Sequence, residues 1–128
     1  METIKAEIKK KIMPNKECAE YEVVEQCLII RLKEELDHHS AMEISQRTDF
    51  MIERGAIKDI IFDFSSVSFM DSSGIGIIMG RYKRVICIGG NVAVVHVGDS
   101  IDRIFKLSGL YKIIKRCATV NDAMACLS

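Results

Sequence analysis

The run Ile57–Phe64 is rich in Ile and Phe and is apolar along almost its whole length. A strand with one solvent-facing side alternates apolar and polar residues, whereas a near-continuous apolar run suits a central strand that is covered on both faces. Such double coverage is typical of α/β folds, in which helices flank a largely parallel sheet. This run therefore constrains the fold class more strongly than any other stretch of the 128-residue chain.

The rest of the chain alternates strand-like and helix-like segments in the same way. Apolar runs predict further strands at residues 21–24, 27–32, 92–97 and 113–114, with a turn at Glu25-Gln26 between the first two. Spacing and end signals predict four helices: from an Asp37 cap to a Gly55 stop, over about residues 73–88, from an Asp99 or Ser100 cap to a Gly109 stop, and from a Thr119 cap through Leu127. The order β-β-α-β-α-β-α-β-α implies a mixed, mostly parallel β-sheet with helices, whose first strand is antiparallel to its hairpin neighbour.

Ligands and partners of such folds usually meet the carboxyl ends of the parallel strands. The loops that follow these ends begin near residues 33–37, 65–74 and 98–100. Asp37 and Ser72 lie in the first two of these loops, so we expect them to share one surface.

Composition excludes several classes of protein. The 18 Lys and Arg residues balance the 18 Asp and Glu residues, so nothing predicts direct nucleic-acid binding, and 48% hydrophobic residues suffice for one globular core. Five cysteines without a C-x-x-C spacing favour buried free thiols over a disulfide framework or zinc site, and indicate a reducing, cytoplasmic location. No apolar run is long enough for a membrane span, and the first residues lack a signal-peptide core.

The single proline, Pro14, marks the one plausible boundary in the chain. Ahead of it, three isoleucines are spaced four residues apart among lysines, a pattern that could form a short basic amphipathic helix. Isolated helices under about 12–15 residues are marginal in water. We therefore predict that residues 1–17 form a flexible basic extension and that residues 18–128 form the domain.

The segment Phe69–Gly76 carries the residues with the clearest chemistry, two serines between an aspartate and two glycines. We expect it to join a strand to a helix, where free backbone N–H groups can bind an anion. A nucleophilic serine is disfavoured, because the G-x-S-x-G elbow needs a glycine where Met70 stands. The histidines do not support a triad either, since His38-His39 follow a helix cap and His96 lies in an apolar run, where a core histidine is expected.

The glycines of this region do not form a nucleotide-binding loop. Gly74, Gly76 and Gly80 miss the G-x-G-x-x-G spacing, and no G-K-[ST] occurs. Each glycine in a helix costs roughly 0.5–1 kcal/mol relative to alanine, so we interpret the three as close contacts, either inside the domain or with another protein. His38 and His39 are adjacent on a helix and cannot face each other, and we predict neither a metal nor a cofactor.

Two interpretations of Ser72 then remain. It is either a plain N-cap, worth about 1 kcal/mol, or an exposed phosphoacceptor. A phosphate there would be favoured by the helix dipole and repelled by Asp71, so it would barely disturb the fold and would act on a docked protein instead. The residues alone do not choose between these two roles, although the plain cap is the simpler.

Three segments in order resemble the anti-sigma factor antagonists of sporulating Gram-positive bacteria, which belong to the STAS domain family. The resemblance covers residues 20–127 and implies one STAS-type α/β domain. The segments that carry it are similar to the first-loop motif, the phosphorylation loop with its following helix, and a third motif of that family: Glu35–His39, Ser68–Gly74 with Gly80–Lys83, and Ser108–Ile114.

The resemblance also implies a mechanism. The unphosphorylated protein would bind an anti-sigma factor that is also a serine/threonine kinase, and would thereby free a sigma factor for transcription during sporulation. The kinase would phosphorylate Ser72, the first serine after the aspartate, and a PP2C-type phosphatase would reverse this. The chain would be a switch and not an enzyme, and its partner-binding residues would be Asp37, Asp71, Ser72, Ser73, Gly74, Ile75 and Gly76.

The chain departs from the family pattern in two places. Glu34 stands where the family often has a glycine, and the N-terminal extension to Met13 exceeds the usual start. Neither departure touches Ser72. Two alternatives stay open: a STAS scaffold in a signalling or stress-sensing assembly, and a module that binds a nucleotide or another small ligand at the Gly74–Gly76 turn.

Overall fold

The computed structural model describes residues 18–33 and 35–128, so the predicted extension over residues 1–17 and the departure at Glu34 lie outside the described residues. Five strands form one sheet in the order β1-β2-β3-β4-β5, in which β1 is antiparallel to β2 and all other neighbours are parallel. This confirms the predicted order of elements and the mixed, mostly parallel sheet. The elements are β1 Ala19–Val24, β2 Cys27–Leu32, α2 His38–Glu53, β3 Asp59–Asp63, α3 Ser72–Ile86, β4 Val92–Val95, α4 Asp99–Ser108, the 3-10 helix η1 Leu110–Lys112, β5 Lys115–Cys117 and α5 Val120–Leu127.

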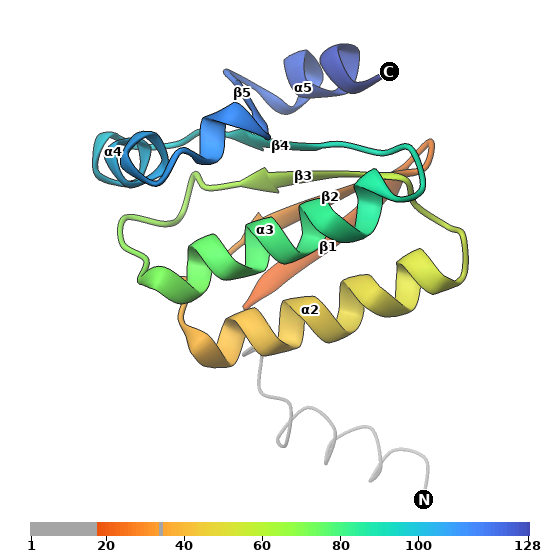
Figure 1. Ribbon diagram of the computed structural model, residues 1–128, viewed down its shortest axis with the longest axis horizontal. Coiled ribbons are helices and arrows are strands. Elements are labelled where there is room, and N and C mark those ends of the chain that lie inside the picture. Colours follow the sequence, from red (N-terminus) through yellow and green to blue (C-terminus); the bar gives the residue numbers. More distant parts are fainter. Residues whose placement is uncertain (1–17, 34) are drawn as a thin grey trace, which may run out of the picture.

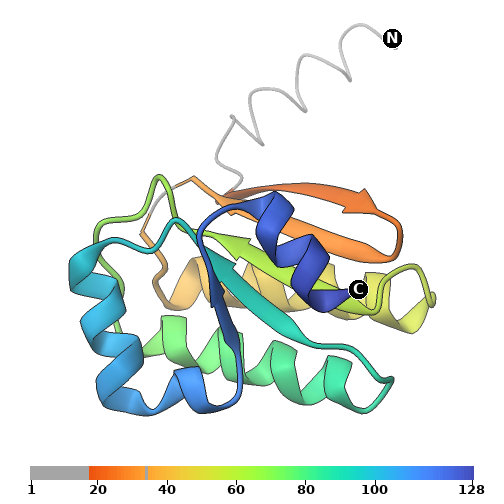
Figure 2. The ribbon, with the colours of Figure 1, turned by 90° about the horizontal axis from the view of Figure 1, so that it is seen from above.

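Helices cover both faces of the sheet. α2 and α3 lie side by side on one face, α5 lies on the other, and α4 lies at one end (Figures 1 and 2). The larger core cluster, which includes Leu28, Ile30 and Phe62, is on the α2–α3 side, and the smaller one, which includes Ile29 and Ile61, is under α5. All residues of β3 are buried, which confirms the two-sided burial predicted from the apolar run.

Two sequence predictions near the end of the chain were wrong. No strand forms at residues 113–114, because the N–H groups of Ile113 and Ile114 bond to the carbonyl of Leu110 in a tight turn. The strand is instead β5, whose exposed Lys115 and Arg116 give no apolar run to detect. The residue before α4, Gly98, occupies the N-cap position without a side-chain bond, so neither Asp99 nor Ser100 is the cap.

Two burial predictions were also wrong. β4 ends at Val95, and His96 is exposed with a φ of 56°, because the chain leaves the sheet there through a left-handed residue. Cys18 and Cys27 are buried free thiols, but Cys87 and Cys126 are exposed. Cys87 is the C-cap of α3, and Cys126 lies in the last turn of α5, beside the buried face of that helix. Within the described part of the chain, no helix has the length and apolar character that crossing a membrane requires.

Candidate functional site

The site is organised by a single bridge between two loops. Leu36 and Met70 form an isolated parallel β-bridge just beyond the carboxyl ends of β2 and β3. α2 and α3 each begin within two residues of it and run side by side in the same direction (Figure 1). The two loops predicted to share a surface therefore do meet, and Asp37 and Asp71 follow the bridged residues directly.

Asp37 begins α2 with a reciprocal cap. Its Oδ1 accepts the backbone N–H of Ser40 at 2.9 Å, and the Ser40 hydroxyl oxygen accepts the N–H of Asp37 at 2.9 Å. The backbone N–H of Ser40, and then its hydroxyl, hold the pKa of the Asp37 carboxyl below its usual value. The predicted cap is confirmed, and the carboxylate stays ionised at neutral pH at the mouth of the site.

Asp71, and not Ser72, is the N-cap of α3. The Oδ1 of Asp71 accepts the backbone N–H of Ser73 at 2.8 Å. Ser72 is the first residue of the helix, is exposed, and its hydroxyl forms no hydrogen bond with residues 18–33 or 35–128. The interpretation of Ser72 as a structural cap was therefore wrong, because the adjacent aspartate takes that role and leaves the serine hydroxyl available.

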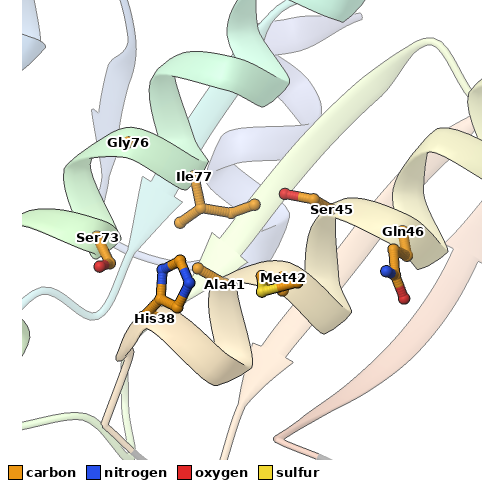
Figure 3. Close-up of a pocket in the computed structure, with 8 residues that line it drawn as sticks. All are labelled: His38, Ala41, Met42, Ser45, Gln46, Ser73, Gly76 and Ile77. Carbon is orange, nitrogen blue, oxygen red and sulfur yellow. The ribbon is translucent and has the colours of Figure 1, made fainter.

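An open groove of about 410 Å³ runs between the first halves of the two helices. His38 and Met42 of α2 line one side, and Ser73, Gly76 and Ile77 of α3 line the other. His38 and Ser73 lie together at one end of the groove (Figure 3). Met42 is 51% exposed, so the groove offers apolar surface directly beside the segment that carries Ser72.

The three glycines of α3 differ in their surroundings. A Cβ on Gly74 would lie 2.6 Å from Met70 Sδ and 3.3 Å from Leu36 Cδ2, so Gly74 allows the helix to approach the bridge. A Cβ on Gly76 or Gly80 would have no neighbour within 4 Å. An internal close contact is therefore confirmed for Gly74 and wrong for the other two, which face open space.

Sequence similarity identifies the domain. Residues 19–123 match the sequence model of the STAS domain. The chain belongs to the STAS family. It is 41% identical over 87 residues to an anti-sigma F factor antagonist of Paenibacillus polymyxa, covering 68% of this chain and 74% of that protein. A second anti-sigma F factor antagonist, from Lysinibacillus sphaericus, is 33% identical over 88 residues, covering 69% and 75%.

Solved structures agree with this assignment. The STAS domain matches SpoIIAA, an anti-sigma factor antagonist, in its unphosphorylated form with a TM-score of 0.70 and 29% identity, over 84% of this chain and 96% of that one. It matches the phosphorylated form of the Bacillus protein SpoIIAA with a TM-score of 0.70 and 32% identity, over 84% and 97%. The predicted resemblance to the anti-sigma factor antagonists of the STAS family is confirmed.

The STAS domain also contains a buried cation that sequence reasoning missed. Arg81 of α3 is 6% exposed, forms an ion pair with Asp49 of α2, and donates to Thr48 Oγ1 at 2.8 Å. Its Nε is buried without a partner in the described structure. The burial of Arg81 could have been predicted from its position in the sequence. It comes four residues after Ile77 and therefore lies on the same, apolar face of the helix. Arg81 joins α3 to α2, the two helices that line the groove.

Proposed function

We propose that this STAS protein is an anti-sigma factor antagonist that is switched by phosphorylation of Ser72. The unphosphorylated form binds an anti-sigma factor that is a serine/threonine kinase and releases a sigma factor, so that transcription for sporulation proceeds in the cytoplasm. A PP2C-type phosphatase removes the phosphate and restores binding. The protein is the substrate and the switch, and the kinase supplies the catalysis. Two relatives of this chain are named anti-sigma F factor antagonists, and this supports the assignment.

One observation carries the choice of Ser72. The exposed hydroxyl of Ser72 stands on the first residue of α3, while the Asp71 carboxylate takes the capping bond to the Ser73 N–H. The Ser72 oxygen is therefore free to attack the γ-phosphorus of ATP in the kinase, with loss of its proton to a base there and departure of ADP. Ser73 is less suited, because its side chain is half-buried at the groove.

The position of Ser72 explains how a phosphate would switch binding and spare the fold. A phosphate carries about −1.5 to −2 charges near neutral pH and would lie at a helix N-terminus, where the dipole favours an anion. Asp37 and Asp71 oppose it at the same surface, and solvent reaches this exposed site. The phosphate loses its hydrating water only when a partner covers it. The free energy of this desolvation therefore weakens the complex and leaves the stability of the fold almost unchanged.

The docking face consists of the starts of the two helices. Asp37 and Asp71 order the loops, Ser72 and Ser73 present hydroxyls, and Gly76 keeps the groove open. The remaining two proposed residues act less directly: Gly74 is buried and permits the close approach to the bridge, and Ile75 is half-buried against the core.

Phosphorylation with mapping tests the proposal. The protein is incubated with a purified anti-sigma factor kinase of this family and ATP, and the modified residue is located by peptide mass mapping. We expect one phosphate, on Ser72, and none on Ser72→Ala. Phosphate on Ser73 alone, or no incorporation into the wild-type protein, would contradict the assignment.

A further inference from the structure

The surface formed by α4, η1 and β5 is basic in a protein of zero net charge. Residues 99–117 contain five cations and two carboxylates, a net charge of +3, so the rest of the chain carries −3. All five cations are exposed. They are Arg103, Lys106, Lys112, Lys115 and Arg116.

One of the two carboxylates is enclosed by this surface. Asp102 accepts the Tyr111 hydroxyl at 2.6 Å, pairs with Lys106 Nζ at 2.9 Å and with Arg116 Nε at 3.2 Å, and its side chain is 13% exposed. It therefore ties α4, η1 and β5 together and fixes two of the five cations, Lys106 and Arg116. Arg103 and Lys112 form no ion pair with the described residues, so their charges face solvent.

Leu107 lies beside two of these cations, Arg103 and Lys106, on α4. It is 82% exposed, more than any other large hydrophobic residue of the described chain, and lies one helical turn from Arg103 on the outer side of α4. Ile113 of the following segment is 37% exposed. The surface thus combines exposed apolar side chains with a net positive charge.

This surface lies at the functional end of the domain. Figures 1 and 2 both place α4 at the end of the sheet where α3 begins, the end that carries Ser72. A specific protein interface buries about 800 Å² on each partner. A partner that holds Ser72 therefore covers much more than one loop, and α4 is the neighbouring element at that end.

We propose that the basic surface of α4 and η1, with Leu107 as its apolar anchor, is a second part of the docking surface for the anti-sigma factor. The inference rests on the proposed function and adds the chemistry of the partner. That partner presents an acidic surface with an apolar pocket, since opposite charges give specificity and faster association. An acidic partner also repels a phosphate on Ser72, so the charge that attracts the free protein helps to reject the modified one.

Charge and apolar variants with matched controls test this surface. Arg103→Glu with Lys112→Glu reverses two unpaired cations, and Leu107→Ser removes the anchor. As controls, Lys83→Glu reverses one exposed cation near the other end of α3, and Ile88→Ser removes an exposed isoleucine just beyond that end. The dissociation constant for the anti-sigma factor kinase is measured at low and high salt, along with KM and kcat for phosphorylation and the melting temperature.

We expect the double charge reversal and Leu107→Ser each to raise the dissociation constant and KM about tenfold or more. We expect kcat and the melting temperature to stay unchanged, and the effect of the charge reversal to shrink at high salt. Wild-type affinity in both variants, or an equal loss in the controls, overturns the inference while leaving the proposed function intact. Failure of the wild-type protein to bind the kinase or to be phosphorylated overturns both.

Discussion

Leu36 and Met70 form a parallel β-bridge that holds together the starts of α2 and α3. The next residue in each loop, Asp37 or Asp71, caps its own helix through a backbone N–H of the first turn. Two helix N-termini thus lie together at one surface, and their dipoles favour an anion there. The bridge explains why Ser72 can be both exposed and fixed in position, as its proposed role of phosphoacceptor requires.

The assignment of the cap predicts that adjacent residues differ in their effect on stability. Asp71→Ala removes the acceptor of the Ser73 N–H and should lower the free energy of unfolding by about 1 kcal/mol. Ser72→Ala and Ser72→Asp should each change it by less than about 0.5 kcal/mol, because the Ser72 hydroxyl has no partner to lose in the described structure.

Urea denaturation of the three variants measures this difference, and Thr119→Ala at the cap of α5 provides a positive control for a cap of known geometry. A loss of 1 kcal/mol or more in Ser72→Ala would restore the interpretation of Ser72 as a structural cap. Ser72→Asp should also weaken binding to the kinase partner at an unchanged melting temperature.

The open faces of Gly76 and Gly80 predict a separation of stability from binding. Each substitution by alanine should raise the free energy of unfolding by roughly 0.5–1 kcal/mol, because a Cβ meets no atom within 4 Å and helix propensity improves. Gly76 lines the groove and Gly80 does not. Gly76→Ala should therefore weaken partner binding about tenfold, whereas Gly80→Ala should leave it unchanged.

Calorimetric titration with the partner, alongside denaturation curves, distinguishes the two variants. If Gly76→Ala bound the partner as tightly as Gly80→Ala and the wild-type protein do, the partner would not contact the groove. Gly74→Ala serves as a contrast, since its Cβ would lie 2.6 Å from Met70 Sδ and should destabilise the protein.

The sequence predicts the fold of this domain well because its strands and long helices have strong periodicity. The central strand β3 and the amphipathic helices α2 and α3 follow from local patterns alone. The exposed edge strand β5 does not, since Lys115 and Arg116 resemble a loop and only pairing with β4 makes them a strand. The predicted turn at Glu25-Gln26 is confirmed. It follows from the two flanking strands and not from its own residues, because both have a positive φ that neither residue type favours.

The candidate site is predictable only in part, for a different reason. Asp71 and Ser72 are both good capping residues and differ by one position, so local preference could not assign the cap between them. The ion pair between Arg81 and Asp49 joins residues far apart in the chain, on two different helices. Neither residue is unusual where it stands in the sequence, and only the packing of α2 on α3 brings them together.

Arg81 is predicted to contribute more to stability than its exposed neighbour on the same helix. Arg81→Ala should lower the free energy of unfolding by about 2–3 kcal/mol, because it removes buried packing between α2 and α3 and leaves Asp49 without its nearer cation. Arg84→Ala should cost less than about 0.5 kcal/mol, since Arg84 is 42% exposed and its partners are 3.6 Å away.

Denaturation of the two variants tests the assignment, and Arg81→Lys provides a further comparison. Lysine keeps the charge but loses the planar fork, so this variant should fall between the wild-type protein and Arg81→Ala. Equal losses for Arg81→Ala and Arg84→Ala would mean that the Arg81 contact does not hold the helices together.

Asp102 is predicted to make the stability of the domain depend on acidic pH. The Tyr111 hydroxyl first, then Lys106 and Arg116, hold the pKa of the Asp102 carboxyl below its usual value. A carboxyl whose pKa is lower in the folded state stabilises the protein above its unfolded pKa of about 3.9, and this contribution disappears as the pH falls through the folded pKa. Wild-type protein should therefore exceed Asp102→Asn in stability at pH 6, and the difference should shrink towards pH 2.5.

Urea midpoints measured from pH 6 to pH 2.5 test this dependence. Tyr111→Phe removes the hydroxyl that donates to Asp102 and should reduce the same pH-dependent difference. The exposed Asp99 lies on the same helix, and Asp99→Asn serves as the control. A constant difference between wild-type protein and Asp102→Asn across this range would show that the carboxylate stabilises α4, η1 and β5 by packing alone. The expected convergence would instead show that the charge of Asp102 connects the three elements through its ion pairs with Lys106 and Arg116.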